Sequence, residues 1–167
     1  MLQKKKTIKR NSNIFHFGLL ILTLFLCFSC SHKKPYESYH PFEKGNWPRF
    51  DIVKFEIPVS KTDGSYDIVL FARLTPQFSY ESLNFNMIMN TPSGEERIRD
   101  YEMKVRSKTG DLVIDCKQGI CEGSVVLKEG LTISKPGKLI IELENLIPRL
   151  EAEGISGIGI RVIESGK

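Results

Sequence analysis

Histidine is scarce in this sequence and lies only near its start. The 167 residues include three histidines, His16, His32 and His40, and none follows His40. Catalysis by a serine nucleophile usually depends on a positioned histidine, and zinc sites draw their ligands mainly from histidine and cysteine. We therefore expect no catalytic residues, no metal site and no cofactor in this chain.

A glycine-rich phosphate loop is also missing. Residues 154–159 read GISGIG, but they lead into a strand pattern rather than a helix. We interpret them as a tight turn and a strand whose glycines allow close backbone approach. Glycoside hydrolysis needs two facing carboxylates, so an enzyme of this kind stays open as an alternative. The candidate carboxylates are Asp100, Glu102, Asp111 and Asp115. We expect them to be solvated strand positions.

The longest apolar run lies at the N-terminus. Five basic residues and no acidic ones precede residues 14–30, which read IFHFGLLILTLFLCFSC. A membrane-spanning helix needs about 20 apolar residues, and this run is shorter and contains His16. The layout is typical of a secretory signal helix that is removed, and its end resembles a bacterial lipoprotein signal. We expect residues 1–29 to be cleaved and Cys30 to be lipidated and to bind the membrane; an uncleaved anchor is the alternative.

Removal of this signal changes the charge of the protein. The whole chain has 24 Lys and Arg against 20 Asp and Glu, a net charge of +4, and five of those bases precede Cys30. The mature chain then has 19 bases against 20 acids, a net charge of −1. Because nucleic-acid binding needs a basic face, we expect no nucleic-acid partner.

The mature chain is expected to be a tether followed by one domain. Residues 30–46 contain prolines and no periodic apolar face, so we assign them to the lipidated cysteine and a tether. Trp47 opens the domain of residues 47–167. We expect its side chain to close one end of the core, with an exposed ligand platform as the alternative.

Alternating apolar and polar residues dominate the domain. The clearest case places Leu83, Phe85, Met87 and Met89 on one face of a strand. Val69 and Phe71 make both faces of the strand at 66–74 apolar, so we expect that strand to be central. Pro148 limits residues 144–153 to a turn or two of helix. About eight such strands predict an all-β, antiparallel sandwich resembling a jelly roll; a closed barrel is the alternative.

Two cysteines remain in the domain, in the segment CKQGIC at residues 116–121. If Gln118 and Gly119 form a two-residue hairpin turn, Cys116 and Cys121 face each other in a closely spaced non-hydrogen-bonded pair. That spacing suits a cross-strand disulfide. Free thiols and redox or metal chemistry are the alternatives, although the spacing differs from that of a Cys-x-x-Cys motif.

An ordered set of short motifs resembles the GldH-type gliding-motility lipoproteins of Bacteroidetes. The motifs follow one another along nearly all of the mature chain and read WPRFDIVKF (47–55), YDIVLFAR (66–73), FSYESL (78–83), TPSG (91–94), KPG (135–137) and GISGIGIR (154–161). The resemblance implies an outer-membrane lipoprotein without a catalytic role, facing the periplasm or exposed on the surface. It would support the gliding machinery and its associated secretion system by binding other envelope proteins.

Three places in the domain are candidates for such contacts. Loops on a rigid sandwich often carry binding residues, so we expect contacts near Trp47 and at the loops 107–111 and 118–119. An envelope carbohydrate-binding sandwich is the alternative function. It would display aromatic side chains on one face, which Trp47, Tyr80 and Tyr101 could supply.

Overall fold

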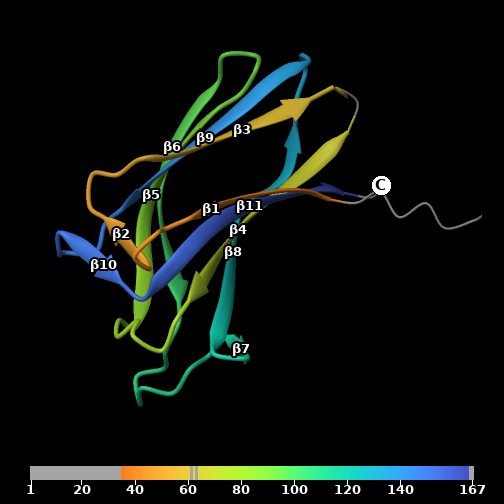
Figure 1. Ribbon diagram of the computed structural model, residues 1–167. Helices are drawn as coiled ribbons and strands as arrows, with labels where there is room; N and C mark the ends of the chain where they lie inside the picture. Colours follow the sequence, from red (N-terminus) through yellow and green to blue (C-terminus); the bar gives the residue numbers. More distant parts are fainter. Residues whose placement is uncertain (1–34, 61, 63, 166–167) are drawn as a thin grey trace, which may run out of the picture. The chain divides into compact units, whose positions relative to one another are not determined.

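The computed structural model describes residues 35–60, 62 and 64–165 (Figure 1). The predicted signal helix and Cys30 lie outside these residues. The described residues contain strands but no helix, and thus none that could cross a membrane. The strands are β1 (Tyr36–Pro41), β2 (Asn46–Pro48), β3 (Val53–Val59), β4 (Ser65–Leu74), β5 (Ser82–Asn90), β6 (Glu96–Lys104), β7 (Asp115–Lys117), β8 (Ile120–Thr132), β9 (Gly137–Asn145), β10 (Glu151–Glu153) and β11 (Ile155–Ser165).

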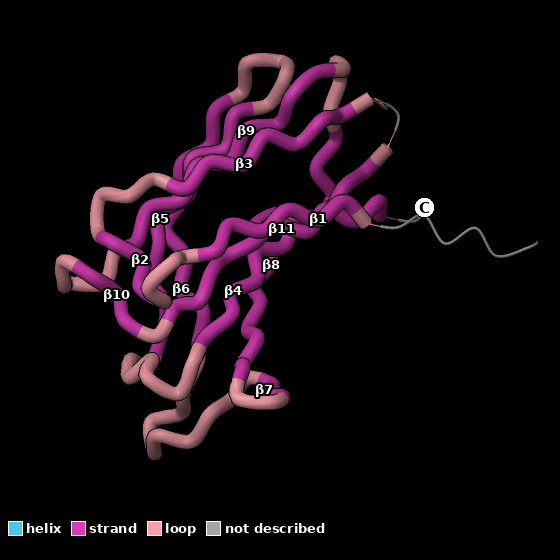
Figure 2. Tube along the Cα trace, in the orientation of Figure 1, coloured by secondary structure: helices cyan, strands magenta, loops and turns pink. Residues whose placement is uncertain are grey.

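Two antiparallel sheets pack around one hydrophobic core (Figure 2). One sheet has the order β1-β11-β4-β8-β7 and the other β3-β9-β5-β6, while β10 and β2 form a separate two-stranded sheet. Both large sheets supply core side chains, such as Leu70 and Ile160 from the first and Phe85 and Ile141 from the second. The predicted antiparallel sandwich is confirmed.

The strand pairing is that of a jelly roll. Setting aside the three-residue strands β2, β7 and β10, eight strands remain, as expected. They pair as nested antiparallel couples: β1 with β11, β3 with β9, β4 with β8, and β5 with β6. Further ladders join β11 to β4 and β5 to β9. The chain is thus a long hairpin rolled into two sheets.

The predicted faces of the strands are also confirmed. Buried and exposed residues alternate along the whole of β3. The four apolar residues predicted to face inward on β5 are all buried, and they are Leu83, Phe85, Met87 and Met89. Strand β4 lies between β11 and β8 and is therefore central, as its two apolar faces predicted.

The structure differs from the sequence prediction at the start of the domain. Residues 36–41, expected in the tether, form the edge strand β1, which pairs from Tyr36 opposite Val162 to Pro41 opposite Gly157. The expectation failed because β1 has no long apolar stripe. Tyr36 packs against the core and its hydroxyl donates to the Glu56 carbonyl at 3.3 Å, whereas Glu37 and Tyr39 make contacts on the outer face of the sheet. Similarly, residues 144–153 contain the end of β9 and β10 and no helical turn.

Candidate functional site

Trp47 lies inside the molecule and not on its surface. Its side chain is 0% exposed. The indole stacks on Phe42 with ring centroids 5.6 Å apart, and its Nε1 donates a hydrogen bond to the Asp51 carbonyl at 3.0 Å. The expectation that Trp47 closes one end of the core is confirmed. Its assignment to an interaction surface is wrong, because these contacts leave no part of the ring accessible.

Tyr80 and Tyr101 are half-buried and do not complete an aromatic face. Both pack against the core. Tyr80 meets Phe78 edge to face at 5.4 Å, whereas Tyr101 stacks on Phe85 at 5.5 Å and its hydroxyl donates to the Leu127 carbonyl. With Trp47 fully buried, the predicted exposed face of three aromatic rings does not exist.

Cys116 and Cys121 face each other across the β7–β8 hairpin. Gln118 and Gly119 both have positive φ, 52° and 82°, as a type I′ turn requires. The register Cys116↔Cys121 and Lys117↔Ile120 is the one the turn predicted. The two sulfur atoms are joined, with the Cα atoms 3.9 Å apart. Whether this bond forms in the native protein stays a prediction.

The loop at residues 107–111 satisfies its own polar groups. The Ser107 and Thr109 hydroxyls are 2.7 Å apart, and Thr109 donates to the Asp111 carboxylate at 2.7 Å. The Arg106 guanidinium donates to the Gly110 carbonyl at 3.1 Å. These bonds describe a closed polar turn, and they mark no particular ligand.

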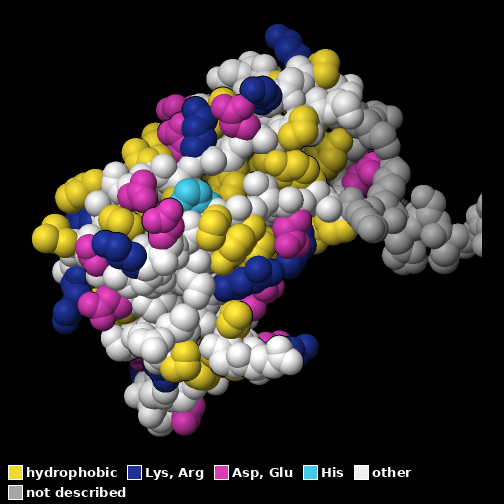
Figure 3. All heavy atoms as spheres, in the orientation of Figure 1, with side chains coloured by type: hydrophobic (Ala, Val, Ile, Leu, Met, Phe, Trp, Pro, Cys, Tyr) yellow, Lys and Arg dark blue, Asp and Glu magenta, His cyan; other side chains and the backbone are white. Residues whose placement is uncertain are grey.

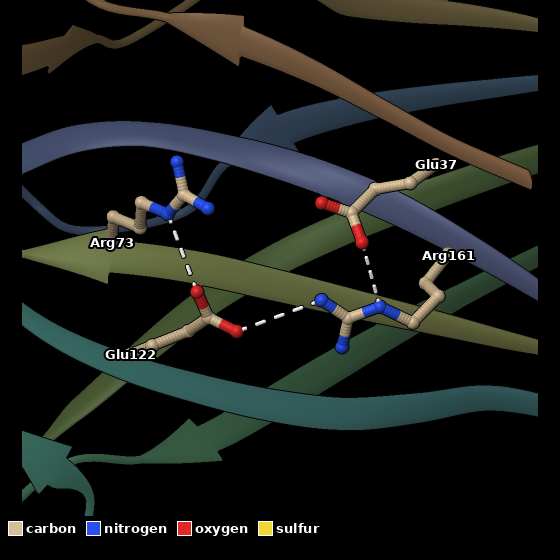
Figure 4. A network of polar contacts seen from close by, with 4 residues as sticks. All are labelled: Glu37, Arg73, Glu122 and Arg161. Carbon is tan, nitrogen blue, oxygen red and sulfur yellow. Dashed lines mark hydrogen bonds and ion pairs between the residues drawn. The ribbon is translucent and has the colours of Figure 1, made fainter. Parts of the chain in front are cut away.

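A charged cluster that the sequence did not reveal lies on the outer face of the five-stranded sheet. Glu37 comes from β1, Arg161 from β11, Arg73 from β4 and Glu122 from β8. The Arg73 Nε lies 3.2 Å from a Glu122 oxygen, and the Arg161 Nε lies 2.8 Å from a Glu37 oxygen. Glu122 also reaches Arg161 at 3.7 Å, so it bridges the two arginines (Figure 4).

The cluster covers an aromatic ring on the outer face of β4. Phe71 is fully buried although it points away from the core. The Arg161 guanidinium lies 4.7 Å above its ring, and Tyr39 stacks beside it at 6.0 Å with Arg73 4.7 Å above the Tyr39 ring. Gly159 makes room, because a Cβ there would lie 2.3 Å from Phe71 Cζ.

The electrostatics of this cluster favour a structural role. Each carboxylate is paired with a guanidinium, so the four charges cancel. Burial raises the pKa of the Tyr39 hydroxyl, and the nearby Arg73 charge opposes that shift. Within the described ranges no three His, Cys, Asp or Glu residues are grouped so as to hold a metal ion. The cluster joins β1 to three other strands.

A second feature missed from the sequence is an exposed apolar tip formed by two loops. Phe50 and Ile52 follow β2, and Leu150 precedes β10; their side chains are 70%, 55% and 77% exposed. The Arg49 amide donates to the Leu150 carbonyl at 2.8 Å and so holds the loops together. No periodic pattern marks these residues. The only signal in the sequence was large apolar side chains in segments rich in turn residues.

Comparison with known proteins places the sandwich in a family. A family model described as GldH lipoprotein matches residues 34–162, from just before β1 into β11. The gliding motility lipoprotein GldH of Flavobacterium johnsoniae is 26% identical over 150 residues, covering 87% of this chain and 94% of that protein.

Two solved structures resemble the fold weakly. Pseudomonas aeruginosa AlgX has a TM-score of 0.40 and 13% identity, over 82% of this chain and 28% of its own. A family GH115 4-O-methyl-α-glucuronidase has a TM-score of 0.37 and 20% identity, over 80% of this chain and 16% of its own. Likenesses at this level bear on no function.

Proposed function

The chain belongs to the GldH lipoprotein family, and from that membership we propose that it is a non-catalytic assembly component of the gliding-motility machinery and its associated secretion system. In this proposal a lipid on Cys30 holds the sandwich at the outer membrane, and the sandwich binds other envelope proteins. The observation that carries the proposal is the family match, because it spans nearly all of the folded domain.

The hydrogen bonds of the candidate carboxylates support a non-catalytic role. Three of the four candidate carboxylates accept hydrogen bonds from neighbouring side chains: Asp100 from Asn86, Glu102 from Ser82 and Asp111 from Thr109. These are the surroundings of solvated structural positions.

The position of Cys30 supports a short anchor. Five residues separate it from Tyr36, the first residue of β1. An extended chain spans at most about 3.5 Å per residue, so the start of β1 would lie within roughly 20 Å of the lipidated terminus. The domain would then work close to the membrane surface.

Replacing the lipidated residue tests the anchor. Cys30→Ala should leave the protein as an unprocessed precursor or release it from membranes, because several acyl chains bind the bilayer strongly and each buried CH₂ contributes about 0.8 kcal/mol. Cys27→Ala is the matched control and should be processed and fractionate normally. Density-gradient fractions probed for the protein measure both, and normal outer-membrane fractionation of Cys30→Ala would refute the anchor.

Gene deletion tests the function. Deletion should lower the abundance or assembly of gliding and secretion proteins in the envelope, and the full-length chain should restore them. A form lacking Cys30 should restore neither. Full gliding supported by this unanchored form would contradict the proposal.

A further inference from the structure

One edge of the four-stranded sheet is open. Strand β6 ends the order β3-β9-β5-β6, so no strand of the described chain pairs with its second side. Its nine residues pair with β5 in one continuous register, and of these nine only Met103 is buried. The backbone of such an exposed edge can pair with a strand of another chain.

The other edges of the two large sheets are protected. Strand β1 has six residues and ends at Pro41, and β3 contains Pro58. Strand β7 has three residues, and β8 has register shifts where it continues beyond β7 along β4. Short strands, prolines and bulges are common protections against unwanted pairing. Strand β6 has none of these three features, so its edge is the one best suited to accept a further strand.

The backbone groups on the open side belong to the even-numbered residues of β6. The Thr91 amide donates to the Glu95 carbonyl at 2.9 Å, which makes these residues a hydrogen-bonded pair where the β5–β6 hairpin begins. Hydrogen-bonded and non-hydrogen-bonded pairs alternate along an antiparallel ladder, so the odd-numbered residues of β6 bond β5. The even-numbered residues direct their N–H and C=O groups away, and no hydrogen bond joins these groups to another described segment: Glu96, Ile98, Asp100 and Glu102.

The core side of β6 is basic near the open edge. Met103 is buried in the core, so the odd-numbered side chains lie on the core side of the sheet. Arg97 and Arg99 share that side. Arg97 pairs with Glu95 in the adjoining turn at 2.6 Å, whereas Arg99 is exposed and forms no ion pair with a described carboxylate. A strand added beside β6 would meet the Arg99 guanidinium on this side.

The outer face of β6 is acidic, and its carboxylates lack counter-charges. No Lys or Arg of the described residues forms an ion pair with them, and they are Glu96, Asp100 and Glu102. Over β3 and β9 the acids are paired, Glu142 with Lys54 at 3.3 Å and Glu56 with Lys138 at 2.6 Å. Figure 3 shows acidic and basic side chains side by side over these two strands. An added strand would therefore meet negative charge on the outer face of β6.

These charges disfavour a second copy of β6 as the occupant. Two antiparallel copies place outer residues opposite outer residues. A register centred on Asp100 puts that carboxylate opposite its copy, and a register centred on Tyr101 puts Asp100 opposite Glu102. A register centred on Arg99 puts two arginines together. Because like charges directly opposite each other destabilise a sheet, the edge rejects itself and favours a strand of complementary charge.

We propose that an extended segment of another envelope protein joins the sandwich as a strand beside β6, with basic side chains opposite Asp100 and Glu102 and an acidic side chain opposite Arg99. The inference rests on the proposed function and names the surface through which the domain holds its partner. In strand addition the backbone hydrogen bonds supply affinity, and the side chains select the partner.

Site-specific cross-linking of the full-length lipoprotein in intact cells tests the proposal. A photoreactive amino acid replacing Lys104, at the end of β6, should form an adduct with one other protein. The cross-linked segment of that protein should contain two basic residues at alternate positions and an acidic residue next to one of them. The same amino acid replacing Ile163, which is 40% exposed on β11, is the matched control and should not form that adduct.

Proline at position 98 separates strand addition from side-chain contact. Ile98→Pro removes an N–H that points away from β5, so it should lower the adduct yield at position 104 at least about tenfold. Its melting temperature should stay near that of Ile98→Thr, because an edge strand accepts proline where the N–H is free. Ile98→Thr keeps the N–H and should lose much less of the adduct. Arg99→Pro removes an N–H of the β5 ladder and should melt at a much lower temperature.

Charge reversal tests how the edge selects its partner. Asp100→Lys with Glu102→Lys should lower the adduct yield at least about tenfold, because basic residues of the partner would then face lysines. Glu43→Lys with Glu153→Lys changes the net charge equally at exposed positions away from β6. This control should keep the adduct.

Several outcomes would overturn the proposal. They are adducts only with a second copy, equal yields at positions 104 and 163, equal losses in Ile98→Pro and Ile98→Thr, and an unchanged yield after reversal of Asp100 and Glu102. An Ile98→Pro protein that melts as low as Arg99→Pro would show that the even-numbered amides are not free. Normal gliding of Ile98→Pro beside a defective deletion strain would refute the β6 edge alone, whereas a deletion strain with normal envelope assembly would refute the proposed function.

Discussion

The backbone at Gly154 leaves no space for a side chain. Its φ is 81°, and a Cβ would lie 2.2 Å from the Phe78 amide nitrogen. Gly154→Ala should lower the free energy of unfolding by more than about 3 kcal/mol, because it combines a left-handed conformation, which costs about 1–2 kcal/mol, with a clash against backbone that must move. Urea denaturation of the purified protein measures the loss.

Gly110→Ala is the control for that prediction. Gly110 also has a positive φ, 90°, but no neighbouring atom lies within 4 Å of the place that a Cβ would occupy. Only the conformational cost applies, so the loss should be about 1–2 kcal/mol. Similar losses for the two variants would show that the close approach at Phe78 does not matter.

The burial of single residues was predictable where it follows the two-residue period of a strand. The inward face of β5 followed from alternation alone, because successive side chains of a strand point to opposite faces. The Glu37–Arg161 pair was beyond such reasoning, since 124 positions separate its members. Phe71 was predicted correctly to lie on the second face of β4. The arginines that bury it were not predicted, because strand pairing brings them to Phe71 and no local sequence pattern indicates that pairing.

Strand β1 shows why an edge strand is hard to recognise from sequence. Its residues YESYHP contain no aliphatic side chain at alternate positions, and Tyr36 and Tyr39, three positions apart, lie on opposite faces. Instead of filling the core, Glu37 and Tyr39 bind side chains on the outer face of β11 and β4. A segment attached in this way resembles a polar linker until its partners are known.

Arg161→Ala should loosen β1. Arg161 bonds Glu37 and covers Phe71, and its loss removes an ion pair and a cation–π contact, together worth about 1–2 kcal/mol. Amide hydrogen exchange of residues 37–40 should become faster than in the parent protein. Arg97→Ala, which breaks an exposed pair with Glu95 at 2.6 Å, should leave those amides unchanged; equal protection of β1 in both variants would contradict the assigned role.

Reduction should affect the β7–β8 hairpin only modestly. The cysteines are five positions apart, and closing so short a loop stabilises by roughly 2 kcal/mol at most. Native, non-reduced protein should show no alkylation of Cys116 or Cys121 by mass spectrometry, and a reductant should lower the melting temperature slightly. Two alkylated thiols in the untreated protein would show that the pair is not oxidised.

At the scale of the whole molecule, the class of fold was predictable and the pairing of strands was not. Alternation and turn residues indicate strands, yet they do not say that β1 pairs with β11 or β3 with β9. The exposed apolar tip also depends on strand pairing that the sequence did not indicate. Its loops meet only because β2 and β10, separated by most of the chain, form a ladder.

The whole sandwich should lose stability in acid. The Gly130 amide and the Ser165 hydroxyl hold the pKa of Asp67 below its ordinary value, and Lys138 does the same for the pKa of Glu56. A carboxylate with a lower pKa in the folded state stabilises it above the unfolded pKa, about 4, and this contribution disappears as the pH falls through the folded pKa.

Urea titrations between about pH 7 and pH 3 measure this effect. Asp67→Asn should flatten the pH dependence, whereas Asp115→Asn, at an exposed position of β7, should keep the slope of the parent protein. An unchanged slope in Asp67→Asn would rule out Asp67 as a source of the acid sensitivity.

The outermost place of β1 has a mechanical consequence. Along the chain, β1 is the first strand that the structure describes after the proposed anchor. A pull between a membrane and an envelope protein bound to the sandwich would enter the domain at β1, so the β1–β11 ladder would be loaded in shear, with its hydrogen bonds sharing the force. The Glu37–Arg161 pair crosses this ladder near the end where the force enters. The domain would then carry tensile force between the membrane and the rest of its envelope assembly.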